Sequence, residues 1–299
     1  MQDYRNILLA TDFSEHSELA GWRAADLVQR LGTRLTLLHV IDYCPEDIPP
    51  EVVSPDDVNP AEYLVDRARA LLATLAKRYG KNNVAQEVIL TEHAARKEIL
   101  HFAKKHQIDL IVIGTHGHHG ITAMLGGTAD QVLHNAPCDV LVVRAGKAAQ
   151  DRSGYTRILG ATDFLDPGYE AAKRVTGLVK AYDAEVMLLH VVEYASELLF
   201  HKLFDSQKVD YLTELRVRAA RDALHDLAKA IGYQNAEQYI ITGTDAAAHE
   251  IVRFAKEHEV DLIAVGAHGR FSIDVLLGPT ANHVLHGASC DVLAVRISR

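Results

Sequence analysis

The sequence lacks the features that mark several large classes of protein. Its three cysteines, Cys44, Cys138 and Cys290, are too few and too scattered for a disulfide framework or a cysteine-based zinc site. No apolar run approaches the roughly 20 residues that a membrane-spanning helix needs. The N-terminus passes from polar residues directly into a short apolar run, without the longer apolar region of a signal peptide. These absences favour a soluble, cytoplasmic protein.

Positive charge is also scarce relative to negative charge. The 31 Lys and Arg residues against 40 Asp and Glu residues give a net charge of −9 at pH 7. A broad electrostatic attraction to nucleic acid or to an anionic membrane is therefore not expected. An anionic ligand would have to be held locally, by backbone N–H groups. With 48% hydrophobic and 24% charged residues, the chain has the composition of a globular protein.

The same series of short motifs occurs twice along the chain. NILLATDF, LTLLHV, DLIVIGTHG and CDVLVV recur in the same order as RILGATDF, VMLLHV, DLIAVGAHG and CDVLAV. Each copy is long enough to enclose its own core, so the repeat indicates a tandem duplication rather than a solenoid. The small, polar stretch GKAAQDRSG separates the copies. We predict domain 1 over residues 1–145, a linker over residues 146–154 and domain 2 over residues 155–299.

Within each copy, short apolar runs alternate with longer segments of helical periodicity. A run such as NILLA or DLIVIG is typical of a strand that is buried on both faces. Strands that alternate with helices predict a parallel sheet with helices on both faces, a doubly wound α/β fold, in each domain. Ligands of such sheets bind beyond the carboxyl ends of the strands. The segments of interest are therefore ATD, after the first strand, and the glycine-rich segment after the fourth.

The segment after the fourth strand has residues suited to a phosphate site. Gly114 ends the apolar run, Gly117 follows it, and Gly127-Thr128 opens the last helix of domain 1. Glycine lets a ligand approach the backbone, and a helix N-terminus supplies N–H donors and partial positive charge. The alternative is that these glycines only end a strand and cap a helix. Their spacing, with the Thr128 hydroxyl beside them, favours phosphate binding.

These residues also carry a family resemblance. The pattern G-x2-G-x9-G-[S/T], with the segments ILLATDFSE, LLHV, DLIVIGTHG and PCDVLVV, resembles the ATP-binding signature and the domain pattern of the universal stress protein family. The resemblance covers nearly all of the chain, as two consecutive domains. It implies a five-stranded parallel sheet of strand order 3-2-1-4-5 in each domain and, as in many members, a bound adenine nucleotide. It also implies that the last strands of the two domains pair, as in a dimer.

The resemblance assigns an ATP site to domain 1. In the family, the Asp after the first strand and the Val that ends the second strand contact adenosine, and these are Asp12 and Val40 here. Asp12 could instead cap the first helix. We expect Mg²⁺ to be bound together with the nucleotide, and ADP or AMP as alternative ligands. The predicted site consists of Ala10, Thr11, Asp12, Val40, Gly114, His116, Gly117, Gly127 and Thr128.

Domain 2 keeps part of this site. The counterparts of the domain 1 residues are Asp163, Val191, Gly266, Gly269 and Thr280. Pro279, however, stands where domain 1 has Gly127. Proline has no N–H but suits the first position of a helix, so the fold is expected to survive while a phosphate donor is lost. We predict tight ATP binding in domain 1 and weaker binding in domain 2.

The histidines of the glycine-rich segment, His116, His118 and His119, give little support for a metal site. His118 and His119 are adjacent, so their side chains point in opposite directions in an extended loop. No Asp, Glu or Cys lies in the loop to complete a set of ligands. We therefore predict no metal site formed by the protein alone.

No motif assigns a catalytic residue. The sequence lacks the Walker A pattern, the dinucleotide-binding fingerprint and a supported Ser-His-Asp or Cys-His arrangement. The favoured function is a nucleotide-binding stress-response protein with a regulatory or protective role. The alternatives are a slow ATP-hydrolysing or adenylyl-transferring enzyme, and a protein-interaction module with empty sites. The apolar segment SELLFHKLF, residues 196–204, adds the expectation of a homodimer or of a lid over the second site.

Overall fold

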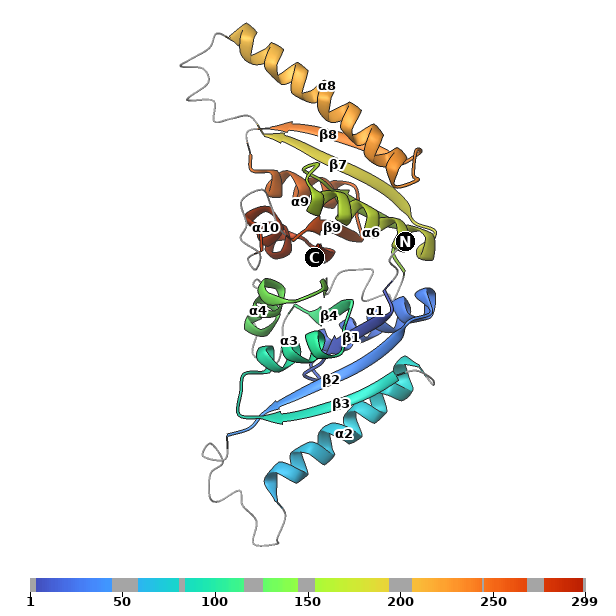
Figure 1. Cartoon of the computed structure of the whole chain (residues 1–299), viewed down its shortest axis with the longest axis vertical. Helices are drawn as coiled ribbons and strands as arrows, with labels where there is room; N and C mark the ends of the chain where they lie inside the picture. Colours follow the sequence, from blue (N-terminus) through green and yellow to red (C-terminus); the bar gives the residue numbers. More distant parts are fainter. Residues whose placement is uncertain are drawn as a thin grey trace. The chain divides into compact units, whose positions relative to one another are not determined.

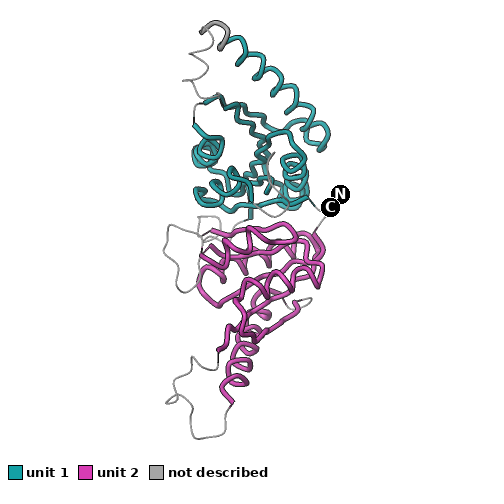
Figure 2. Tube along the Cα trace, turned by 60° about the vertical axis from the view of Figure 1, so that its left-hand side comes forward, with its two compact units in different colours: residues 1–2, 153–299 teal, residues 3–152 magenta. Residues whose placement is uncertain are grey.

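The structure is a computed structural model of the whole chain (Figure 1). It describes residues 4–44, 59–80, 84–115, 126–144, 154–193, 206–243, 245–267 and 277–297. The chain forms two compact units, residues 3–152 and residues 153–299 with 1–2, and each unit holds one copy of the repeated motifs (Figure 2). The predicted linker, apart from Gly154, and the apolar segment 196–204 lie outside the described residues. No described helix combines the length and the apolar character needed to cross a membrane.

Domain 1 alternates strands and helices from end to end. Its elements are β1 (Asn6–Ala10), α1 (Glu15–Leu31), β2 (Arg34–Asp42), α2 (Pro60–Tyr79), β3 (Val84–Thr91), α3 (Ala95–Lys105), β4 (Leu110–Gly114), α4 (Gly127–Asn135) and β5 (Asp139–Val143). The strands are parallel and lie in the order β3-β2-β1-β4-β5. Helix α1 contacts α2, and α3 contacts α4, and the two pairs cover opposite faces of the sheet (Figure 1).

Domain 2 repeats this arrangement. Its elements are β6 (Arg157–Ala161), α6 (Asp166–Tyr182), β7 (Glu185–Glu193), α8 (Ser206–Ala230), β8 (Glu237–Gly243), α9 (Ala247–Glu257), β9 (Leu262–Gly266), α10 (Pro279–Gly287) and β10 (Asp291–Val295). The strands are again parallel, in the order β8-β7-β6-β9-β10. The predicted fold of two tandem doubly wound domains is confirmed.

The central strand of each sheet is buried on both faces. Ile7, Leu8 and Leu9 of β1 have no exposed surface, and neither have Ile158 and Leu159 of β6. The backbone groups of β1 pair with β2 on one side and with β4 on the other. A strand in this position tolerates only apolar side chains, which explains the continuous apolar runs of the sequence. Polar side chains that form a site must therefore come from the ends of the strands.

Helix α1 has a capping residue at each end. Ser14 is its N-cap, and the Ser14 hydroxyl accepts a hydrogen bond from the Ser17 N–H at 3.3 Å. Gly32 ends the helix in the left-handed conformation, with φ of 65°, which glycine adopts without strain. In domain 2, Leu165 occupies the N-cap position of α6 and makes no side-chain cap hydrogen bond. The first helix of domain 2 therefore lacks the side-chain cap of domain 1.

A carboxylate anchors the start of the first strand in each domain. Asp109 Oδ2 accepts hydrogen bonds from the backbone N–H groups of Arg5 and Asn6, both at 2.8 Å. In domain 2, Asp261 Oδ2 accepts a hydrogen bond from the backbone N–H of Arg157 at 3.0 Å. The aspartate that opens the DLIVIG and DLIAVG segments thus has a structural role, because it satisfies N–H groups that the sheet leaves unpaired.

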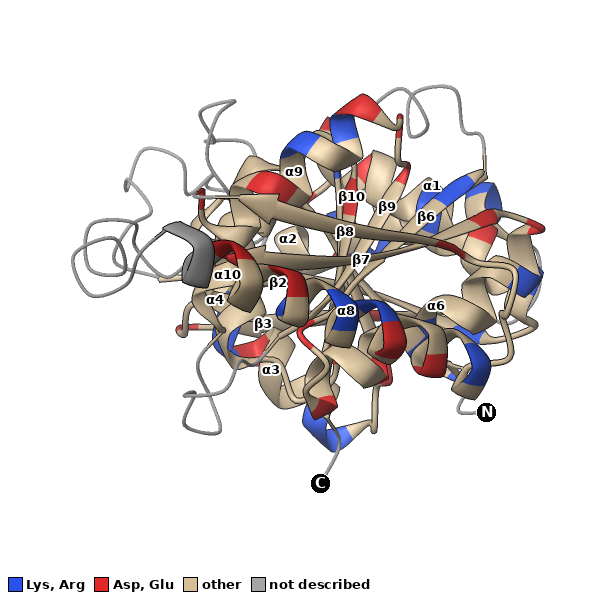
Figure 3. Cartoon of the chain, turned by 90° about the horizontal axis from the view of Figure 1, so that it is seen from above, with Lys and Arg blue, Asp and Glu red and all other residues tan. Residues whose placement is uncertain are grey.

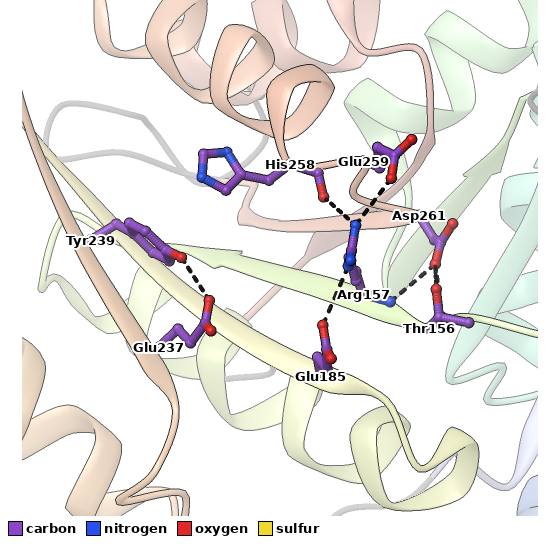
Figure 4. A network of polar contacts seen from close by, with 8 residues as sticks. All are labelled: Thr156, Arg157, Glu185, Glu237, Tyr239, His258, Glu259 and Asp261. Atoms are coloured by element: carbon purple, nitrogen blue, oxygen red, sulfur yellow. Dashed lines mark hydrogen bonds and ion pairs between the residues drawn. The ribbon is translucent and has the colours of Figure 1, made fainter.

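Beside this anchor, domain 2 has an ion-pair network around Arg157 (Figure 4). The Arg157 guanidinium lies 3.3 Å from Glu185 and 3.2 Å from Glu259, and it also donates to the His258 carbonyl oxygen at 3.2 Å. Domain 1 has the shorter Asn6 in the place of Arg157. The glutamate side chains of the network are exposed, so these pairs contribute little to stability.

Charges of both signs lie along the outer helices, as Figure 3 shows for α8. On this helix Arg218 lies 3.9 Å from Glu214, and on α2 Arg69 lies 3.3 Å from Asp66. Each pair is spaced by three or four residues, so its members meet on one face of the helix. Such exposed pairs stabilise a helix by about 0.3–0.5 kcal/mol each. The mixed charges keep these two helix surfaces polar.

A buried hydrogen bond ties the residues before the first strand of each domain to its last strand. The Tyr4 hydroxyl donates to Asp139 Oδ2, and the Tyr155 hydroxyl donates to Asp291 Oδ2, both at 2.8 Å. All four side chains are buried. Buried polar groups need partners, and the same contact occurs in both domains. We infer that it positions β5 and β10 in their sheets.

We expect Tyr4→Phe and Tyr155→Phe each to lower the free energy of unfolding by about 1–3 kcal/mol, because a buried carboxylate loses a donor. Tyr63→Phe is the matched control, since the Tyr63 residue is 55% exposed. Urea unfolding followed by circular dichroism measures the difference. A Tyr4→Phe protein as stable as the Tyr63→Phe control would contradict this assignment.

Candidate functional site

A cavity of about 570 Å³ opens at the carboxyl ends of β1, β2 and β4 in domain 1. The first turns of α3 and α4 form its other wall. It is lined by all of the predicted site residues that the structure describes, namely Ala10, Thr11, Asp12, Val40, Gly114, Gly127 and Thr128. His116 and Gly117 lie outside the described residues. The residues that the sequence separates by more than a hundred positions therefore meet around one cavity.

Hydrogen bonds order the turn between β1 and α1. Asp12 Oδ1 accepts from the backbone N–H of Ser14 at 3.0 Å and from its hydroxyl at 2.5 Å. Thr11 Oγ1 accepts from the Phe13 N–H at 3.1 Å, and Phe13 has a positive φ of 63°. The N-cap of α1 is therefore Ser14, and the alternative that Asp12 itself caps this helix is wrong. Asp12 stabilises the turn through Ser14 and also lines the cavity.

Gly114 has a packing reason to be glycine. A Cβ atom at this position would lie 2.7 Å from the His16 carbonyl oxygen, at the start of α1. The same holds in domain 2, where a Cβ on Gly266 would lie 2.6 Å from the Pro167 side chain. These distances are too short for any side chain, so both glycines are required for the first helix to approach the fourth strand. This close approach accounts for Gly114 without a ligand.

Packing against the described residues does not require glycine at position 127. Gly127 is the first residue of α4, and a Cβ atom there would meet none of the described atoms within 4 Å. The helix start makes no side-chain cap hydrogen bond, since its N-cap is Gly126. The first N–H groups of a helix have no partner within the helix. Gly127 therefore leaves donors and open space together on the wall of the cavity.

Domain 2 has the same helix start with a different residue. Its N-cap Gly278 has φ −64° and ψ 152°, against −62° and 147° for Gly126. The N–H of Gly278 donates to the Ala267 carbonyl oxygen at 2.7 Å, as the N–H of Gly126 does to Thr115. Pro279 thus takes the first helical position without a change in the backbone, as expected. It removes one N–H and adds a ring at this position.

The other predicted residues of domain 2 are only partly described. Asp163 accepts a hydrogen bond from the Leu165 N–H at 3.0 Å, in the turn that matches the one after Asp12. Val191 lies near the end of β7, and Thr280 lies in the first turn of α10. Gly269 lies outside the described residues.

Some cavity residues were missed in the sequence analysis. Thr115 and Asp42 line the cavity next to predicted residues, and Ser17 lies one turn into α1. Thr115 and Asp42 could have been found from their positions at the ends of apolar runs. Ser17 lies beside Thr11, whose hydroxyl donates to Ser17 Oγ at 3.0 Å, and no sequence pattern reveals this contact. In domain 2, the counterparts of Thr115, Asp42 and Ser17 are Ala267, Glu193 and Gly168.

A carboxylate of domain 2 lies at the start of a helix. Glu193 Oε1 accepts a hydrogen bond from the Ala247 N–H, at the start of α9, at 2.6 Å. The Arg216 guanidinium, from α8, donates to the Glu193 carbonyl oxygen at 2.9 Å. In domain 1 the counterpart of Glu193 is Asp42, which lines the cavity. Domain 2 therefore places its own carboxylate at a helix N-terminus, a position that favours negative charge.

One histidine in each domain lies at the second strand of the sheet. His39 Nδ1 lies 2.8 Å from the Thr11 carbonyl oxygen, and His190 Nδ1 lies 2.8 Å from that of Thr162. Burial lowers the pKa of both imidazoles below the usual value, since it disfavours the charged form. Both rings are therefore neutral at pH 7, and His39 gives the cavity no fixed positive charge.

The described residues contain no group of three or more His, Cys, Asp and Glu side chains arranged to hold a metal ion. The histidine cluster His116, His118 and His119 lies outside them. The polar groups at the cavity are instead hydroxyls, carboxylates and helix N–H groups. This set suits an uncharged or anionic organic ligand with hydroxyl groups, and a metal ion that enters with its own anionic ligand.

Residues 3–144 and 154–296 each match the profile of the Universal stress protein family. Curated relatives include Universal stress protein A homolog 1 and homolog 2 of Coxiella burnetii (strain RSA 493 / Nine Mile phase I). Both are 35% identical to this chain, over 140 and 145 residues, which is 47% and 48% of the chain and 96% of each relative. A solved universal stress protein from Archaeoglobus fulgidus DSM 4304 has the same fold over 99% of both chains, with a TM-score of 0.68 and 20% identity. The chain therefore belongs to the universal stress protein family, and it carries two domains of that family in tandem.

Proposed function

We propose that the chain is a stress-response protein that binds ATP, as its Mg²⁺ complex, in the cavity of domain 1. Its role would be regulatory or protective, and ADP or AMP would compete for the same cavity. Membership of the family supports a stress protein. The residues of the cavity support a nucleotide, as the resemblance of the sequence implies.

The observation that carries the proposal is the open space at Gly127. Neither backbone conformation nor the packing of the described residues requires glycine there, because its φ is not positive and a Cβ would meet no described atom within 4 Å. The residue nevertheless stands at an uncapped helix start on the cavity wall. Helix N-termini of this kind bind phosphate groups through their free N–H donors. A ligand that approaches the backbone closely accounts for a glycine that the protein itself does not need.

The rest of the cavity lining has the mixed character that a nucleoside needs. Leu38, Ile99 and Ile113 provide apolar surface, while the Asp12 carboxylate can accept hydrogen bonds from ribose hydroxyls. The volume of about 570 Å³ falls within the roughly 300–1,000 Å³ typical of small-molecule sites. These features support the assignment of adenosine to Asp12 and Val40, and of the phosphates to the start of α4.

Domain 2 should bind the same ligand more weakly. Pro279 removes one N–H from the helix start that corresponds to the phosphate end. A hydrogen bond to a charged group contributes about 1.5–3 kcal/mol, so the loss of one donor weakens binding by roughly tenfold to a hundredfold. The two domains should differ less in their affinity for AMP, because its single phosphate is less extended.

We expect titration of the purified chain with Mg²⁺ and ATP to give one tight binding event per chain. Gly127→Pro should weaken this event by roughly tenfold to a hundredfold, because domain 1 then has the helix start of domain 2. Pro279→Gly is the reciprocal variant, and it should strengthen binding in domain 2. Isothermal titration calorimetry measures both. Two ATP sites of equal affinity in the unmodified chain, or an occupied domain 2 beside an empty domain 1, would refute the proposed asymmetry.

Gly127→Ala separates ligand approach from protein stability. The added Cβ meets no atom of the residues that the structure describes, and alanine favours a helix more than glycine does by about 1 kcal/mol or less, so the unfolding midpoint should not fall. Affinity for ATP should nevertheless drop, since the methyl group enters space that the phosphates would use. Calorimetry and urea unfolding of the same sample test both statements. An alanine variant with unchanged ATP affinity would argue against phosphate contact at this position.

We further propose that the last strands of the two domains pair within one chain. The apolar runs CDVLVV and CDVLAV would otherwise form exposed sheet edges, which invite association. Each domain expressed alone should therefore self-associate, whereas the full chain should not do so through these strands. Sedimentation velocity of the two halves and of the full chain provides the comparison. If both halves run as monomers, the pairing is not needed and this proposal fails.

A further inference from the structure

Domain 2 carries two histidines on neighbouring helices of one face. His249 lies in the first turn of α9, and His283 lies near the middle of α10. Their ring centres are 6.3 Å apart, with an angle of 89° between the ring planes. Both residues are exposed. Two imidazoles that come from different helices are thus held close together at the surface.

The packing of the two helices sets this distance. The Val252 side chain of α9 lies beside Gly287 of α10, where an added Cβ atom would be 3.4 Å away, an ordinary van der Waals distance. Close-packed helices move little relative to one another. The positions of His249 and His283 on facing surfaces therefore follow from the fold, and do not depend on a loop.

A hydrogen bond selects the tautomer of one imidazole. His283 Nδ1 lies 2.8 Å from the Pro279 carbonyl oxygen, one turn earlier in α10. A carbonyl oxygen only accepts, so Nδ1 carries the proton, and in the neutral ring the lone pair remains on Nε2. Histidines that bind metals commonly donate their other ring N–H in this way, which orients the ring and raises its basicity. The Nε2 atom of His283 is therefore available as a ligand.

The rings lie near the spacing of two ligands of one metal ion. A nitrogen ligand binds zinc at about 2 Å, which puts each ring centre about 3.2 Å from the metal and the two ring centres of a tetrahedral site about 5 Å apart. The observed distance of 6.3 Å is about 1 Å longer. Both side chains are at the surface, so rotation about their χ angles can close this difference.

We propose that His249 and His283 bind one divalent transition-metal ion, with Zn²⁺ as the ion to be tested. Imidazole is a preferred ligand for this class of metal, whereas Mg²⁺ and Ca²⁺ prefer oxygen. Since no third His, Cys, Asp or Glu of the described residues joins the pair, the remaining positions on the metal are open to water or a small anion. A site with open positions can bind a further ligand.

Domain 1 lacks this pair, and so it provides an internal comparison. Lys97 and Gln131 occupy the corresponding positions on α3 and α4. Neither is a zinc ligand of the usual kinds. The metal site thus belongs to the domain whose glycine signature is altered, and it does not depend on the proposed nucleotide site of domain 1.

The experiment is a zinc titration of the full chain, stripped of metal and nucleotide, as the unmodified protein and as His249→Asn, His283→Asn and the double variant. His225→Asn is the matched control, because His225 is an exposed histidine on α8 of the same domain. We expect each single variant to lose one zinc-binding event, or to bind that zinc ion with an affinity about 10- to 100-fold lower. The double variant should lose no more than either single variant, since both imidazoles serve one ion. His225→Asn should bind as the unmodified chain does.

Thermal unfolding gives a second readout, because an ion that binds only the folded chain raises the unfolding midpoint. Zn²⁺ should raise the midpoint less in both single variants than in His225→Asn, while all variants should unfold alike without metal. Mg²⁺ should give no difference among them. The proposal is wrong if the single variants bind zinc as the unmodified chain does. It is also wrong if their losses add, which would mean two independent histidines.

Discussion

Burial of the central strand on both faces is the constraint on which the rest of each domain depends. The apolar side chains of β1, from Ile7 to Leu9, have no exposed surface, and their backbone groups can pair only with β2 and β4. A parallel sheet follows, with helices on both faces. Since no polar side chain can come from the middle of such a strand, Asp109 anchors one end and the Thr11–Asp12 turn forms the other. Site chemistry is thereby confined to the strand ends.

The glycines of the signature differ in what they do. Gly114 and Gly266 are required by the close approach of the first helix, and both domains therefore keep them. No contact with the described residues requires Gly127, and domain 2 replaces it with Pro279 while the helix start keeps its backbone geometry. Under the proposed function a ligand constrains this position, which can change when the ligand is lost, whereas a packing position cannot change without moving the helix.

Duplication let the second domain change at its surface and at its strand ends. Glu193 caps α9, Arg216 reaches the end of β7, and His249 and His283 meet across α9 and α10. None of these changes touches the buried strands, so the fold of domain 2 tolerates them at little cost in stability. The two domains thus share one architecture and present different chemistry at comparable positions.

The amino-acid sequence by itself determined the duplication, the doubly wound fold and seven of the sixteen residues that line the cavity. These follow from short-range patterns, because apolar runs, glycines and helix signals act within a few residues of one another. Only the tertiary structure decided that Ser17 faces the cavity and that Gly114 is a packing residue. It also decided that His249 and His283 are neighbours. Each of these depends on which surfaces the packed helices and strands bring together. The local sequence around a residue does not show which distant residues it will contact.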